Sequence, residues 1–235
     1  MTLTPGDISM FTVAPIPEDK LQTRYIAPFG LTALLRPSKP GESVDSLWIG
    51  GQGEAGIVLF VSALDAEIYR LRSLTINREW VRHPLEVIGF RHTVETLGKA
   101  WTNLVFGFNA NTRGKLVLGP SGCILLPHYQ ESFGPLDRPS GPAIFRLGER
   151  LFETMKERWD LMGEPDRAST IAKVNALGTT AAGSVQLKEI AEKALRLVKI
   201  APIGDAAHER IDYATFNTDT SQWCYGPNEA RQHLH

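Results

Sequence analysis

The chain has 235 residues and a formal net charge of −1, with 43% hydrophobic and 22% charged residues. That length can bury a sizeable core without disulfides. Neither half carries the clustered excess of Lys and Arg that phosphate-driven nucleic-acid binding needs. A nucleic-acid surface would require five scattered arginines to converge on one face: Arg70, Arg72, Arg78, Arg82 and Arg91. We therefore rank a nucleic-acid partner last.

Several features favour a cytoplasmic protein with no membrane partner. The first twenty residues lack the basic start and apolar run of a signal peptide. No stretch approaches the roughly eighteen apolar residues of a membrane span. Cys123 and Cys224 are too few and too far apart for a disulfide framework, so we expect reduced thiols.

The first half of the chain has the pattern of short strands. Prolines repeatedly interrupt the first 45 residues, and short strands at residues 10–14 and 30–35 fit between them. Apolar runs at 46–50 and 56–62 flank a glycine-rich connection, which predicts a hairpin. Further strands are predicted at residues 103–109, 115–118 and 123–127, separated by turn residues.

Two short helices are predicted within this β-rich half. Ser62 can cap a helix over residues 63–73, with Asp65 in its first turn. A second helix is predicted over 92–101, where Val94, Leu97 and Trp101 would share one face.

Residues 129–142 contain three prolines and two glycines, which is typical of a linker. Beyond it, apolar residues at helical spacing predict one helix from 144 to 162. Asp166 can cap a second helix that Gly178 closes, and Ser184 can cap a third that Pro202 stops. The tail has the pattern of two strands around a turn at 217–220.

We therefore predict an α+β fold. It has an N-terminal antiparallel β-rich part with short helices, a helical segment after residue 143 and a C-terminal β-hairpin. The composition divides the chain into a β-rich region, 1–135, and a helical region with the closing hairpin, 143–235. The same pattern also fits one continuous domain, in which the tail hairpin returns to the first sheet.

One glycine motif has the spacing of a dinucleotide-binding loop, from Gly51 through Gly53 to Gly56. Such a loop must open a helix, because the pyrophosphate sits on the helix N-terminal amides. Here Gly56 is followed by a β-branched and aromatic run, which predicts a strand. We interpret the stretch as a hairpin turn and expect no cofactor.

The two candidate metal sites lack the ligands or the spacing that a zinc site requires. The zinc-protease motif that begins at His208 and Glu209 has Asp212 where the second histidine should be. Cys224, His233 and His235 do not have a familiar zinc spacing. We expect no bound metal.

Two classes of function remain. The first is a non-enzymatic, protein-binding accessory, regulatory or immunity-type protein, because no nucleophile–base motif or phosphate loop is evident. Trp223 and Tyr225 alternate in the last strand and are the predicted binding residues. The alternative is a hydrolase or transferase whose dispersed site pairs a carboxylate with one of three histidines: His92, His128 and His208.

Overall fold

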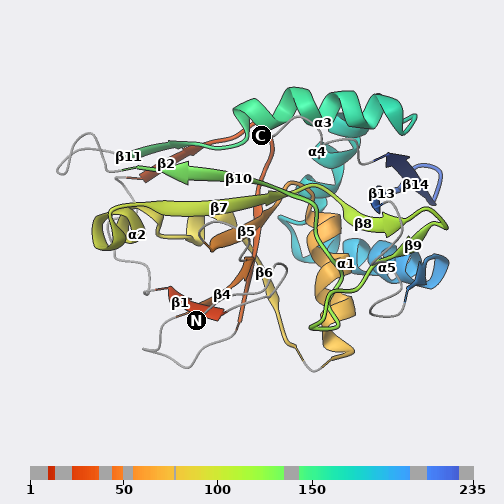
Figure 1. The fold of residues 1–235 in the computed structure, drawn as a ribbon, viewed down its shortest axis with the longest axis horizontal. Coiled ribbons are helices and arrows are strands. Elements are labelled where there is room, and N and C mark those ends of the chain that lie inside the picture. The colour runs from red at the N-terminus through yellow and green to blue at the C-terminus, as the bar shows by residue number, and fades with distance from the viewer. Residues whose placement is uncertain are drawn as a thin grey trace.

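The computed structural model describes seven stretches of the chain: residues 10–13, 23–36, 44–49, 55–76, 78–134, 143–201 and 211–227. Helices and strands are mixed and most strand pairs are antiparallel, so the predicted α+β fold is confirmed (Figure 1). None of the described helices is long and apolar enough to cross a membrane.

The largest sheet has the order β1-β4-β3-β5-β7-β10, and β6 also pairs with β3. Its strands are β1 (Met10–Val13), β3 (Thr32–Leu35), β4 (Val44–Ile49), β5 (Gly56–Phe60), β6 (Val81–Pro84), β7 (Ala100–Val105) and β10 (His128–Phe133). β4 and β5 form the predicted hairpin, with Trp48 opposite Ile57. β5 then pairs parallel with β7. Every residue of β5 is buried, because its alternating side chains enter two different core clusters.

A second sheet joins both halves of the sequence. Its order is β12-β9-β8-β13-β14. The strands are β8 (Phe108–Asn111), β9 (Lys115–Leu116), β12 (Lys199–Ile200), β13 (Ile211–Asn217) and β14 (Gln222–Pro227). The predicted tail hairpin, β13–β14, is present, and it pairs with β8. A small parallel pair, β2 (Thr23–Ile26) with β11 (Ala143–Arg146), also crosses the two regions. The division at 1–135 and 143–235 stays a prediction.

Six helical segments complete the described fold. They are α1 (Ala63–Leu74), the 3-10 turn η2 (Leu85–Val87), α2 (Phe90–Leu97), α3 (Glu149–Leu161), α4 (Arg167–Leu177) and α5 (Ala181–Leu197). α1 begins where predicted, and the Ser62 side chain accepts a hydrogen bond from the backbone N–H of Asp65. α3 lies along the outside of the molecule, and α1 packs against one face of α5 (Figure 1).

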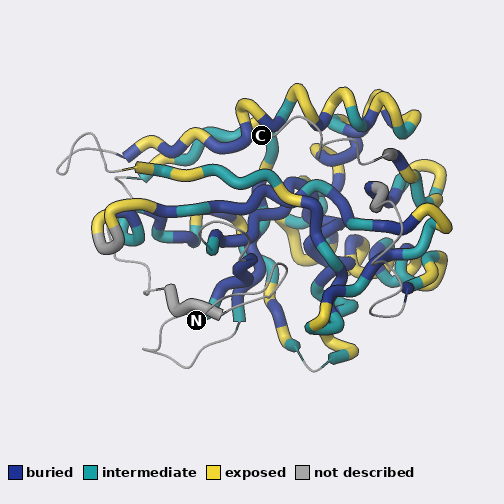
Figure 2. Tube along the Cα trace, in the orientation of Figure 1, coloured by how far each residue is buried: buried dark blue, intermediate teal, exposed yellow. Residues whose placement is uncertain are grey.

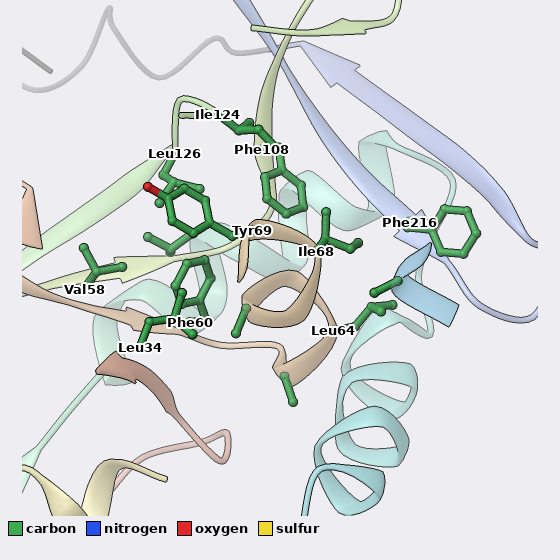
Figure 3. Packing of buried hydrophobic residues seen from close by; sticks show 14 of the residues in the cluster. Leu34, Val58, Phe60, Leu64, Ile68, Tyr69, Phe108, Ile124, Leu126 and Phe216 are labelled. Atoms are coloured by element: carbon green, nitrogen blue, oxygen red, sulfur yellow. The ribbon is translucent and has the colours of Figure 1, made fainter. Parts of the chain in front are cut away.

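Two apolar clusters hold these layers together. The first joins α1 and α5 to the inner faces of both sheets, and Phe60, Tyr69 and Phe108 are among its largest members (Figure 3). The second includes the opposite face of β5 and the inner face of α3. Figure 2 shows the result, with β5 buried along its length and the outer side of α3 exposed.

Several predicted boundaries were wrong because tertiary pairing overrode the local pattern. Trp101 and the residue before it belong to β7, so the second helix ends at Leu97. The strand predicted over 103–109 breaks at Gly107, whose φ is 99°. A Cβ there would lie 2.7 Å from the Ala214 carbonyl oxygen, so the bend needs glycine. Of residues 123–127, Ile124 forms only an isolated bridge with Leu118.

The predicted linker and two helix starts also differ. Tyr129–Phe133 of the linker belong to β10, which pairs with β7 in full register. Ile144 lies in β11, paired with β2, so α3 starts only after Gly148, in the left-handed region. Thr180, not Ser184, caps α5, and its hydroxyl accepts from the Gly183 N–H at 3.0 Å. Pairing partners far away in sequence decided the first two cases, whereas the start of α5 is set by the local Thr180 cap.

Candidate functional site

The predicted histidines do not form a shared site among the described residues. His92 lies on α2 and is half-buried. His128 starts β10, is exposed, and has its Nδ1 3.2 Å from the Leu126 carbonyl oxygen. Neither ring forms a hydrogen bond or an ion pair with a carboxylate of the described residues. His208 lies outside those residues.

The two predicted binding residues have different surroundings. The Trp223 indole N–H donates to the Ala194 carbonyl of α5 at 2.9 Å, and its ring packs edge-on against Phe108 and Phe216. Trp223 therefore packs inward. Tyr225 is 38% exposed, and its hydroxyl donates to the Gly114 carbonyl at 2.9 Å. Only Tyr225 presents much of its ring to solvent.

The glycine motif and the metal candidates lie largely outside the described residues. Residues 50–54, His233 and His235 are among the parts not described. Gly56 begins β5, so a strand follows the motif, as predicted, and a Cβ there would lie 2.9 Å from Nδ2 of Asn103. Across the described stretches no three His, Cys, Asp or Glu side chains are grouped to hold a metal ion.

A cavity of about 390 Å³ lies where the starts of β3 and α1 meet β6 and the end of α4. Its lining side chains include Thr32, Arg82, His83, Glu86, Asn175 and Thr179. Burial lowers the pKa of His83 below its ordinary value, so its imidazole is neutral at pH 7. The side chains of His83 and Glu86 make no hydrogen bond or ion pair with the described residues.

The Arg82 side chain is fixed by contacts with Glu67 of α1 and Ser184 of α5. Its Nε donates to Oε2 of Glu67 at 2.7 Å, and its Nη2 lies 3.4 Å from the Ser184 hydroxyl. Glu67 also accepts two hydrogen bonds from Arg70, at 2.7 and 2.9 Å. Burial by itself would raise the pKa of Glu67, but the hydrogen bonds and charges of the two arginines lower it. The carboxylate is therefore ionised and fixes Arg82.

Asn175 fastens three segments around the same cavity. Its Oδ1 accepts from the Ala63 N–H at 2.7 Å. Its Nδ2 donates to the carbonyls of Gly30 at 2.8 Å and Val61 at 3.0 Å. One side chain of α4 thus fixes the start of α1 and the approach to β3, and so shapes the cavity wall.

A separate cluster of charged groups lies in the interior. Arg167 donates to the Phe216 carbonyl at 2.7 Å, and its guanidinium lies 3.9 Å from Asp65 and 3.6 Å from Glu164. Glu164 accepts a 2.5 Å hydrogen bond from Thr215. These residues are almost fully buried. Burial raises the pKa of Asp65 to about 6, although Arg167 opposes the shift.

Cys224 lies beside this cluster. Burial, together with the neighbouring Glu164 carboxylate, raises the pKa of this thiol to about 11. A thiol with so high a pKa is protonated near pH 7 and is a poor nucleophile. Cys123 is buried in the first core cluster.

Sequence reasoning considered Arg82 only as one of five scattered arginines, and it did not select His83, Glu86 or Asn175. Of the five arginines, Arg70 and Arg82 pair with the same carboxylate, Glu67, and Arg91 pairs with Glu95, so the charges of these three are partly neutralised; the low rank of a nucleic-acid partner stays a prediction. The cavity joins residues from β3, α1, β6 and α4, and no short motif contains them together. Comparison of the chain with protein-family models, curated proteins and solved structures gave no match.

Proposed function

We propose that this protein works by binding another protein, in an accessory, regulatory or immunity-type role, and that β14 adds a strand from the partner to its sheet. The observation that carries the proposal is the position of β14 at the edge of its sheet. β13 pairs with one side of β14, and no described strand pairs with the other. The unpaired backbone groups of an edge strand can pair with an extended segment of a partner.

The composition of β14 supports this role. Edge strands are commonly protected by short length or by charged side chains. The opposite edge of the sheet, β12, has only two residues. β14 has six residues, and none of them is charged. Tyr225 also gives this strand an exposed aromatic side chain, of the kind enriched at protein interfaces, although its ring extends across the sheet toward Gly114 and not over the free edge.

The alternative, a hydrolase or transferase, has less support. It requires His92, His128 or His208 beside a carboxylate. The described residues give neither His92 nor His128 such a partner. Strand addition needs no assembled catalytic group, only the edge that β14 presents.

A pull-down from native cell extract would identify the partner, using the wild type and the double variant Gln222→Lys/Tyr225→Lys. Lysines on an edge strand oppose strand addition. Gln186→Lys/Val185→Lys is the matched control, because it places two lysines on the exposed face of α5. We expect the partner to bind the wild type and the control but not the edge variant.

Amide hydrogen exchange with the purified partner then tests the mechanism. Strand addition should slow exchange within residues 222–227, since new backbone hydrogen bonds form there. Equal binding to the edge variant, or unchanged exchange in β14, would contradict the proposal. If the chain associates with itself through this edge, the bound partner is a second copy of the same chain.

A further inference from the structure

We infer that the cavity between β6 and the end of α4 binds a small zwitterion of the size of a free α-amino acid, with Arg82 holding its carboxylate and Glu86 holding its ammonium group. This site is separate from the β14 edge and does not depend on it. The cavity volume of about 390 Å³ falls at the small end of ligand pockets, which span roughly 300–1,000 Å³.

The geometry prepares Arg82 for an anion. Glu67 and Ser184 occupy Nε and Nη2, while Nη1 makes no hydrogen bond to the described residues. Glu67 is shared by Arg70 and Arg82, so these three groups together carry one positive charge. A guanidinium held in place by a buried carboxylate loses little freedom on binding, which favours recognition of a ligand carboxylate.

Two helix ends of opposite polarity meet at this cavity. The positive N-terminal end of α1 contributes Ala63, and the negative C-terminal end of α4 contributes Gly178 and Thr179. They are close together: a Cβ placed on Gly178 would lie 3.3 Å from the Ala63 Cβ and 3.2 Å from Nη1 of Arg82. Because these opposite helix ends lie side by side, their dipoles largely offset each other and the side chains carry the recognition of charge.

The remaining side chains also match a zwitterion. Glu86 lines the cavity without an ion-pair partner among the described residues, so it can accept an ammonium group. His83 is neutral and makes no hydrogen bond there, so it can donate or accept one without adding charge. The lining thus offers one cation and one carboxylate. A simple anion would meet repulsion from Glu86, and a simple cation would meet repulsion from Arg82.

Isothermal titration calorimetry on the full chain would test the site with the free α-amino acids as probes. For the tightest of these, two analogues follow, one without the amine and one without the carboxylate. We expect saturable binding of the amino acid and at least about tenfold weaker binding of each analogue, as expected when one charged hydrogen bond is lost.

Two variants locate the site. Arg82→Gln and Glu86→Gln should each weaken amino-acid binding by about tenfold or more. Their matched controls are Arg196→Gln and Glu153→Gln, which change exposed residues on α5 and α3. Glu86 is exposed, so Glu86→Gln tests the site even if Arg82→Gln disturbs folding. No binding of any amino acid at millimolar concentration, or binding that both variants retain unchanged, would overturn the inference.

Discussion

The Asp65 carboxylate and the Arg167 guanidinium lie 3.9 Å apart in the interior, with only 3% and 2% of their side chains exposed. Asp65 is on α1 and Arg167 begins α4, so the pair joins two helices far apart in sequence. Glu164 is the second buried carboxylate beside the same arginine. The cluster therefore contains two carboxylates for one guanidinium, and this imbalance leads to the first two predictions.

Arg167→Met should destabilise the protein strongly. It would leave Asp65 and Glu164 buried without a counter-ion and remove the hydrogen bond to the Phe216 carbonyl. Breaking a buried ion pair by removing one partner typically costs about 3–5 kcal/mol. Urea denaturation would measure the loss. Arg150→Met, at an exposed position, is the control, and a similar small effect for both variants would contradict the prediction.

The free energy of unfolding of the Asp65→Asn variant should increase relative to that of the wild type as the pH rises. The pKa of Asp65 is raised from 3.8 to about 6 in the folded protein. Between these values the folded state binds more protons than the unfolded state, so the free energy of unfolding falls with rising pH. The loss is complete above about pH 6 and amounts to roughly 3 kcal/mol.

The comparison of Asp65→Asn with the wild type by urea denaturation at pH 4 and pH 7.5 isolates this group. Asparagine removes the titration and keeps an oxygen that can accept a hydrogen bond. Asp160→Asn, on the exposed side of α3, serves as the control and should show no such trend. If the difference in free energy of unfolding between Asp65→Asn and the wild type is the same at both pH values, or is less favourable to Asp65→Asn at pH 7.5, the pKa of Asp65 is not raised.

Asn175→Ala should lower stability by about 2 kcal/mol or more. The change removes three hydrogen bonds and leaves the Ala63 N–H and two carbonyls without their partner. Ser169→Ala, at an exposed position of α4, is the matched control. Thermal unfolding of both variants gives the result. Equal melting temperatures would mean that Asn175 does not fasten these segments.

Trp223→Ala and Tyr225→Ala should have unequal effects on stability. Trp223 packs against Phe108 and Phe216 and donates to Ala194, so its loss should cost about 3 kcal/mol. Tyr225 loses one hydrogen bond at the surface, which contributes about 1 kcal/mol. Urea denaturation separates the two. A larger loss for Tyr225→Ala would contradict the inward packing of Trp223.

Cys224 should react slowly with a thiol reagent near pH 7, because the raised pKa keeps the thiol protonated. Cys123 is buried and should be inaccessible in the folded state. The rate of reaction with a chromogenic disulfide, in the Cys123→Ala variant, measures Cys224 alone. Labelling as fast as that of a small free thiol at pH 7 would refute the prediction. Unfolding in urea should restore a normal rate.

Local patterns predicted much of the fold. The Ser62 cap and the helical spacing after it define α1, Asp166 precedes α4, and the alternating tail gives β13 and β14. Predictions were wrong where a distant partner decided the structure. Ile144 has the spacing of a helix but pairs in β11 with β2, and Tyr129 lies in β10 rather than in a linker.

The sequence by itself determined the fold class, the hairpins and the approximate helices, because turn residues, caps and apolar periodicity act over a few neighbouring residues. Only the tertiary structure decided which side chains share a site. Arg82, Glu86 and Asn175 meet at one cavity because β6 pairs with β3 and α4 ends beside α1. Such contacts join residues far apart in the chain, so their geometry exists only once both sheets and the helices between them have packed.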